Sequence, residues 1–239
     1  MGESKVLLYN GALYKQENFN HRRGFNVHQL TRHRVIPFLI LVFTLIAFPA
    51  RASALGEPDI PPLDEFIEGV MNGEADALRG VYIPDLLADL VTPQPDDNPA
   101  YVSSRRDTLT QFGLASNYGS TGLLAHNYLA GKSFSHLDKG QPIVLIYGDG
   151  RTETFVITEF MRFQALTPDS ITSNFVDLDD GEFLSASKLF LEAYDRPGHL
   201  ILQTCIFANG DNSWGRLFII AEPYDENIVN LRSSPLAFD

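Results

Sequence analysis

Short apolar runs separated by turn residues recur through the second half of the chain. Pro142–Tyr147 and residues 154–158 are rich in β-branched and aromatic side chains. Between them lies Gly148-Asp149-Gly150, and Asp-Gly is a strong local hairpin signal. Residues 160–166 can continue the second strand. The pattern therefore predicts a β-hairpin over residues 142–166.

A second hairpin is predicted nearer the C-terminus. Residues 200–205 and 217–221 are aliphatic runs, and Asn209-Gly210-Asp211-Asn212 supplies the turn between them. Helical spacing of apolar residues appears only over residues 63–71 and 184–194. Short strands with Gly and Asp turns and little helix indicate an all-β barrel or sandwich.

The N-terminal part has the order of a secretory signal. Arg32-His33-Arg34 precedes the apolar run 35–48, and Ala52-Ser53-Ala54 gives a small-x-small cleavage site. The run is short for a membrane span, which needs about 20 apolar residues. We expect an exported protein, secreted or associated with the cell envelope. The alternative is an uncleaved membrane anchor formed by residues 35–48.

The charge changes sign where the signal ends. Residues 1–54 hold seven basic and two acidic residues, a net charge of +5, whereas the remainder holds 11 basic and 28 acidic residues, a net charge of −17. Such acidity excludes nucleic acid as a partner. Four domain segments follow: 1–54 leader and signal, 55–78 partly helical extension, 79–225 β-domain and 226–239 tail.

One acidic segment, with Asp177, Asp179, Asp180 and Glu182, has the clustered oxygens that calcium prefers. Its spacing does not match a twelve-residue EF-hand loop. A solvated acidic loop is the better interpretation, so we expect no metal and no cofactor.

Cys205 is the single cysteine, so no internal disulfide can form. A lone cysteine in an exported chain is either a buried small hydrophobe or a free reactive thiol. Cys205 ends one predicted strand, and Arg216 opens the next, eleven residues on. Antiparallel pairing across the 209–212 turn would place the two side by side. His126 ends another short apolar run, which starts at Leu123.

These three residue types suit acyl transfer. A thiolate is the nucleophile, and an ordinary thiol is only slightly ionised at neutral pH. A histidine can exchange the proton, because its ordinary pKa is about 6.5. An arginine can stabilise the negative charge on the carbonyl oxygen.

The same residues resemble the sortase family. Leu202-Gln203-Thr204-Cys205 is similar to the sortase L-x-T-C motif, with Arg216 and His126 at the positions of the family arginine and histidine. Residues 80–91, which contain Ile83-Pro84, resemble the opening strand. The resemblance implies a closed eight-stranded β-barrel with one or two short helices in its loops. It also implies a cysteine transpeptidase, which cleaves a sorting peptide in an exported protein and transfers the acyl group to an amine.

Further contacts are predicted around this trio. Thr204, Trp214 and the segment from Ser170 to Asp195 are candidates for substrate binding, and Trp214 and Phe207 can line the acceptor side. The sorting peptide and an amine of the cell envelope or a pilin-like lysine are the expected partners. Membrane contact is expected only through the N-terminal segment.

Other interpretations compete with this one. His199 could replace His126, but it begins the strand that Cys205 ends. Caspase-like and papain-like peptidases fit poorly, because Ile206-Phe207 follows the cysteine and no histidine lies downstream of it. A hydrolase on the same scaffold and a catalytically idle envelope binding module stay open as alternatives.

Overall fold

The computed structural model describes residues 60–170 and 172–224. The predicted leader, signal and 226–239 tail lie outside the described residues. The strands are β1 (Leu78–Ile83), β2 (Leu87–Pro93), β3 (Thr108–Phe112), β4 (Thr121–Leu124), β5 (Pro142–Tyr147), β6 (Thr152–Ala165), β7 (Phe175–Asp177), β8 (Phe183–Leu184), β9 (Leu200–Ala208) and β10 (Asp211–Pro223). The helices are α1 (Leu63–Val70), α2 (Gly113–Ser116), the 3₁₀-helix η1 (Ala130–His136) and α3 (Ala186–Tyr194).

Eight of these strands form a closed barrel. Their order is β10-β9-β4-β3-β2-β1-β5-β6, and pairing of β6 with β10 closes the ring, while β7 and β8 extend outward from β6. The pairs β2–β3 and β4–β9 are parallel, and the others are antiparallel. The predicted closed eight-stranded barrel is confirmed. No helix in the described ranges is long and apolar enough to cross a membrane.

Both predicted hairpins are present. β5 and β6 join through Gly148 to Gly150, and the Gly150 amide donates to the Tyr147 carbonyl at 2.9 Å. β9 and β10 join through Asn209 and Gly210, whose φ angles are 53° and 81°. Positive φ at both central residues is the signature of a primed turn, for which Asn-Gly is preferred. The turn chemistry therefore explains why these two strands meet in this register.

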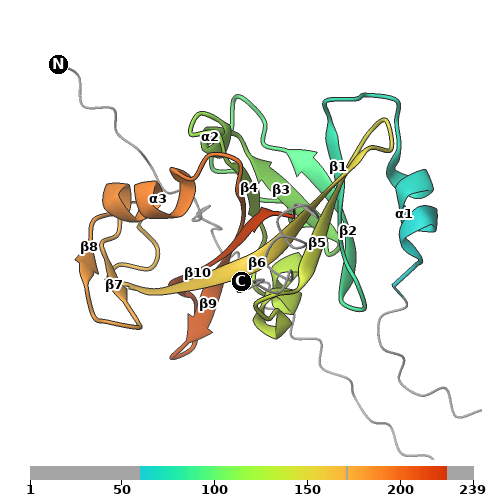
Figure 1. Cartoon of the computed structure of the whole chain (residues 1–239). Coiled ribbons are helices and arrows are strands. Elements are labelled where there is room, and N and C mark those ends of the chain that lie inside the picture. Colours follow the sequence, from blue (N-terminus) through green and yellow to red (C-terminus); the bar gives the residue numbers. More distant parts are fainter. Residues whose placement is uncertain (1–59, 171, 225–239) are drawn as a thin grey trace, which may run out of the picture. The chain divides into compact units, whose positions relative to one another are not determined.

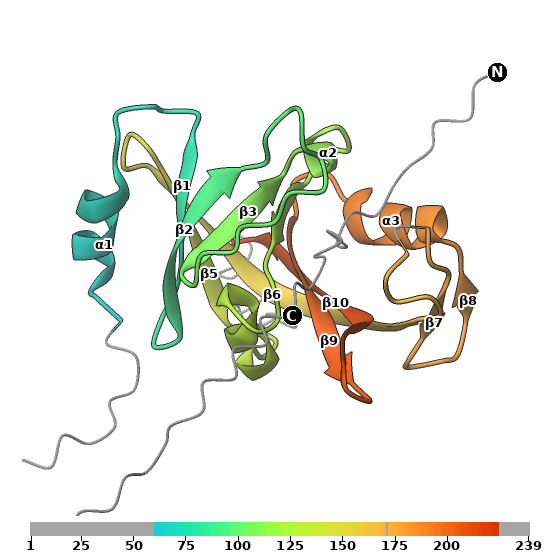
Figure 2. The same ribbon diagram turned by 180° about the vertical axis from the view of Figure 1, so that it is seen from behind.

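Two main apolar clusters lie on the two faces of the barrel wall. The inner cluster fills the barrel and includes Leu200 and Leu202 of β9, with Phe134 of η1 covering one end. The outer cluster packs α3 and β7 against the wall and includes Ile201. Alternate residues of β9 thus point to opposite faces, as the period of a strand requires. Figures 1 and 2 show α3, β7 and β8 gathered on one side of the barrel and α1 on the other.

The predicted helix over residues 184–194 corresponds to α3, which begins two residues later. Ser185 is its N-cap, and the Ser185 hydroxyl accepts a hydrogen bond from the Lys188 amide at 3.2 Å. The predicted helix over 63–71 is α1. η1 has no counterpart among the sequence predictions, because residues 130–136 carry no apolar stripe of helical period.

Candidate active site

Cys205 and Arg216 are directly opposite each other on β9 and β10, as the turn at 209–212 predicted. Residues opposite each other in an antiparallel pair project from the same face of the sheet. Cys205 lies four residues after Ile201, and Arg216 lies two residues before Phe218, so each shares a strand face with that apolar residue. Ile201 and Phe218 both belong to the outer cluster. The thiol and the guanidinium therefore belong to the outer face of the barrel wall.

His126 follows the end of β4, the strand on the other side of β9. Leu124 pairs with Gln203 in parallel, and the Ala125 amide donates to the Gln203 carbonyl at 3.0 Å. Continuing this register by two residues brings His126 level with Cys205. The His126 carbonyl then accepts hydrogen bonds from the amides of Leu129 and Gly131, so the chain turns away at this point. Cys205 and Arg216 thus lie on neighbouring strands, and His126 lies just beyond the end of the strand on the other side of β9.

The histidine ring is half-buried. It stacks on Tyr128, with ring centroids 5.2 Å apart. Burial lowers the pKa of His126 below its ordinary value, and a backbone hydrogen bond with Val102 opposes that change. The imidazole is therefore neutral at neutral pH and able to accept a proton.

The thiol is also neutral at rest. Burial raises the pKa of Cys205 above the ordinary thiol value, the nearby Arg216 charge lowers it, and Asp211 raises it. Desolvation is the largest of these effects. The thiol and the imidazole are therefore both uncharged at neutral pH.

Arg216 is only 5% exposed. Its guanidinium donates at 2.9 Å to the Ser213 and Gly215 carbonyls and lies 3.5 Å from the Pro168 carbonyl. No carboxylate lies within 4.0 Å of it in the described part of the chain. Burial of an uncompensated cation is costly, so its place beside a thiol favours a role in binding negative charge.

The other predicted contacts are distributed differently. Thr204 is 3% exposed, and its hydroxyl donates to the Ala125 carbonyl at 2.8 Å, so this side chain fastens β4 to β9. Trp214 is half-buried where the β9–β10 register shifts. His199 is half-buried just before β9 begins, at the opposite end from Cys205, with Nδ1 3.1 Å from the Pro197 carbonyl.

The segment from Ser170 to Asp195 is more ordered than a simple loop. It contains β7, β8 and α3, and its apolar residues form much of the outer cluster. Three of its acids are paired: Asp179 with Arg162 at 2.7 Å, and Glu182 and Glu192 with Lys188 at 2.5 and 3.5 Å. Within the described residues, no group of three or more His, Cys, Asp or Glu side chains is arranged to hold a metal ion.

Asn127 makes a hydrogen bond that the sequence did not predict. Its side-chain amide donates to the Asn212 carbonyl at 3.0 Å, across 85 residues of sequence. This bond ties the chain just after His126 to the turn that joins the Cys205 and Arg216 strands. Its only sequence signal is that Asn127 directly follows the candidate histidine.

Comparison with known proteins gave structural matches only. No family model matches the chain, and no curated protein matches it. It is similar to sortase C from Clostridium perfringens SM101, with 14% identity, 68% of this chain and 82% of that chain covered, and a TM-score of 0.38. It is also similar to sortase A from Corynebacterium diphtheriae, with 14% identity, 64% of this chain and 62% of that chain covered, and a TM-score of 0.43. Sortase C1 from Streptococcus suis has 13% identity, 68% of this chain and 78% of that chain covered, and a TM-score of 0.43.

These neighbours are sortases, as the resemblance of residues 202–205 predicted. The likeness at 13–14% identity concerns the fold alone, and TM-scores below 0.5 assign no activity and no residue roles. The roles of Cys205, His126 and Arg216 rest on their own geometry and chemistry.

Proposed function

We propose that this protein is a cysteine transpeptidase of the sortase type. One observation carries the proposal: Cys205 and Arg216 face each other across β9 and β10, and His126 lies two residues beyond the end of β4, the strand on the other side of β9. The thiol and the guanidinium belong to the outer face of the wall, and His126 is level with Cys205 when the β4–β9 register is continued, which supports a site where one carbonyl group meets nucleophile, base and cation.

The first half-reaction makes a thioacyl enzyme. The Cys205 thiol gives its proton to His126, and Sγ attacks the carbonyl carbon of the substrate peptide. Arg216 stabilises the negative charge that forms on the carbonyl oxygen. As the tetrahedral intermediate collapses, the C–N bond breaks and His126 gives the proton to the leaving amine.

The second half-reaction returns the thiol. An amine attacks the thioester carbonyl, a new C–N bond forms, and the C–S electron pair returns to sulfur. The donor is a sorting peptide of an exported protein, and the acceptor is an amine of the cell envelope or a pilin-like lysine. The predicted signal at residues 32–54 supports action outside the cytoplasm, in the secreted fraction or at the envelope.

The test is to incubate the 55–239 protein with a library of short peptides and an amine, and to follow products by mass spectrometry. We expect a covalent adduct on Cys205 and a product joined to the amine. Cys205→Ala should abolish both while lowering the free energy of unfolding by less than about 1.5 kcal/mol. Residual turnover above about a tenth of wild type contradicts the nucleophile assignment.

Two other outcomes separate the alternatives. Release of free acid with no amine product identifies a hydrolase on the same scaffold, because water then resolves the thioester. An idle binding module would form no adduct with any peptide. It would also show the same iodoacetamide labelling rate at Cys205 in wild type and in His126→Ala.

A further inference from the structure

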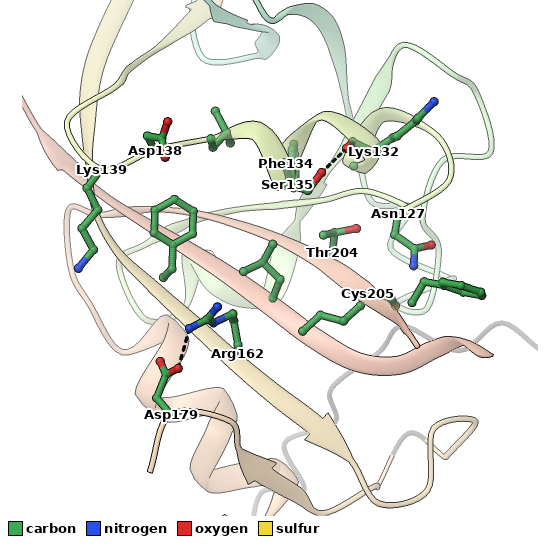
Figure 3. A pocket seen from close by; sticks show the side chains of 16 residues that line it. Asn127, Lys132, Phe134, Ser135, Asp138, Lys139, Arg162, Asp179, Thr204 and Cys205 are labelled. Carbon is green, nitrogen blue, oxygen red and sulfur yellow. Dashed lines mark hydrogen bonds and ion pairs between the residues drawn. The ribbon is translucent and has the colours of Figure 1, made fainter. Parts of the chain in front are cut away.

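A groove of about 1040 Å³ lies beside Cys205, between η1 and the strands β6, β9 and β10 (Figure 3). Its floor is apolar and includes Phe134, Phe160 and Leu217. Phe207, which is 61% exposed, lines the end nearest the β9–β10 turn. The groove is large enough to hold several residues of a peptide.

This groove opens on the other face of the wall from Arg216. Thr204 and Leu217, which are opposite each other in the β9–β10 register, both line it. They alternate with Cys205 and Arg216 along their strands, so their side chains point the other way. Cys205 lies at the boundary, since it also lines the groove. Cys205 can therefore be approached from two directions.

The groove is basic in an acidic domain. Residues 60–224 contain ten Lys or Arg and 23 Asp or Glu, yet three of the ten basic residues, Lys132, Lys139 and Arg162, line this groove. The acids that line it are Asp138 and Asp179. The groove therefore has an excess of positive charge within a strongly negative surrounding.

Two of these cations are free to bind a ligand. Lys132 lies in η1 and Lys139 three residues beyond its end, and Figure 3 shows them at opposite ends of this helix. Both are exposed, and neither has a carboxylate within 4.0 Å in the described ranges. Arg162, in contrast, is paired with Asp179 at 2.7 Å.

We propose that this groove binds the amine acceptor, and that the acceptor is a peptide or amino-acid amine bearing a carboxylate, which Lys132 and Lys139 recognise. The inference rests on the proposed function. The acyl donor must place its carbonyl against Arg216 on the outer face. The amine acceptor therefore approaches Cys205 from the other face, where the groove lies. Lysines repel a simple diamine and attract a carboxylate, while the apolar floor receives aliphatic stems.

The acceptor reacts in its neutral form. Its nitrogen attacks the thioester carbonyl carbon, the C–N bond forms, and the C–S electrons return to Sγ of Cys205. The proton of the attacking amine passes to the imidazole of His126 and from there to the thiolate. No oxidant, reductant or further reactant is required.

A binding experiment tests the groove without turnover. The Cys205→Ala protein is titrated with fluorescently labelled Gly-Gly-Glu, with Gly-Gly-Lys amide and with inorganic phosphate. We expect Gly-Gly-Glu to bind at least about tenfold more tightly than the lysine peptide, with an affinity that falls as salt rises. The double variant Lys132→Ala/Lys139→Ala should bind Gly-Gly-Glu about tenfold more weakly. The double variant Lys132→Arg/Lys139→Arg should keep most of the affinity for this peptide.

The control removes the same charge elsewhere. Arg151→Ala/Lys188→Ala deletes two cations that lie outside the groove and should leave binding unchanged. An equal loss in this control, equal affinity for the two peptides, or tighter binding of phosphate than of the acidic peptide overturns the proposal. In the wild-type protein, Gly-Gly-Glu should be the better acceptor in transfer.

The two proposals fail in different ways. Saturable, lysine-dependent binding of Gly-Gly-Glu without any acyl transfer rejects the transpeptidase and keeps the groove as a carboxylate-peptide site. Acyl transfer that is indifferent to Lys132 and Lys139 keeps the transpeptidase and rejects the groove as its acceptor site.

Discussion

Arg216 is held by backbone carbonyls, and this arrangement makes its geometry matter as much as its charge. Two of its hydrogen bonds reach carbonyls of the β9–β10 hairpin itself, and Pro168 lies on its other side. A planar guanidinium can keep such contacts while presenting further N–H groups to an oxyanion, and an ammonium cannot.

Arg216→Lys should therefore lose most of the activity although it keeps the charge. Removal of one donor to an oxyanion typically costs about 10²–10³ in rate. The measurement is the rate of thioacyl formation from a donor peptide under single-turnover conditions. Near-normal turnover in the lysine variant would show that Arg216 acts only through its charge or not at all.

The thiol gives a second prediction at this scale. Because burial raises the pKa of Cys205, alkylation by iodoacetamide should reach its half-maximal rate at a higher pH than that of free cysteine. Arg216 lowers this pKa and Asp211 raises it, so Arg216→Ala should move the profile to higher pH and Asp211→Asn to lower pH. Shifts in the same direction in both variants would contradict the electrostatic assignment.

The sequence could predict one of the two contacts of Cys205 and not the other. Arg216 follows it across a four-residue turn of known type, so local chemistry determines the pairing. His126 is brought close by parallel pairing of β4 with β9, which joins positions 79 residues apart. No local pattern encodes that pairing. The sequence showed only that His126 ends a short apolar run, and the resemblance to a known family supplied its place beside Cys205.

At the scale of elements, two side-chain hydrogen bonds connect the turn after β4 to the β9–β10 hairpin. Thr204 donates to the Ala125 carbonyl, and Asn127 donates to the Asn212 carbonyl. Both bonds connect the segment that carries His126 to the strands that carry Cys205 and Arg216. They are expected to hold the histidine at reacting distance.

Asn127→Ala removes the hydrogen bond from the Asn127 side chain to the Asn212 carbonyl. We expect thioacyl formation from donor peptide alone to slow by about tenfold, because small misplacement of a base has large kinetic effects. The free energy of unfolding should fall by only about 1 kcal/mol. Ser133→Ala, which loses a hydrogen bond within η1, is the matched control and should keep full activity. Equal rates in the two variants would remove Asn127 from the positioning role.

η1 shows why this element escaped sequence prediction. Gly131 lies against β9, and a Cβ atom there would come 2.5 Å from the Thr204 hydroxyl and 2.9 Å from the His126 carbonyl. A close approach of backbone to strand, rather than an apolar stripe, keeps η1 in place. The hairpins and α3 could be predicted because their turn residues and periodicity are local, whereas η1 depends on a tertiary contact.

At the scale of the whole molecule, one acid lies inside the barrel. Asp89 lies on β2 two residues from both Leu87 and Val91, so it shares the inner face with these members of the inner cluster, and it is 8% exposed. Burial, assisted by Asp107, raises the pKa of Asp89 to about 7. Nothing in the composition distinguishes this carboxyl from the other acids of the chain.

This carboxyl makes stability depend on pH. The folded state binds a proton between about pH 4 and pH 7 that the unfolded state has released, so stability falls as pH rises through this range. The change amounts to about 4 kcal/mol at most, from the shift between 3.8 and about 7. Asp89→Asn should flatten the pH dependence and stabilise the protein at pH 8, measured by urea unfolding. An unchanged slope would show that Asp89 titrates normally.

Closure of the barrel by β10 also has a consequence for the order of events during folding. β10 pairs with β9 on one side and with β6 on the other, and it is the last strand in the described chain. A chain that emerges N-terminus first therefore holds Cys205 without its arginine until almost all of the domain has appeared. Pairings between distant strands also form slowly. Chemical competence thus arrives with the final strand, and a chain cut short before Arg216 holds the thiol and the histidine without the cation that stabilises the oxyanion.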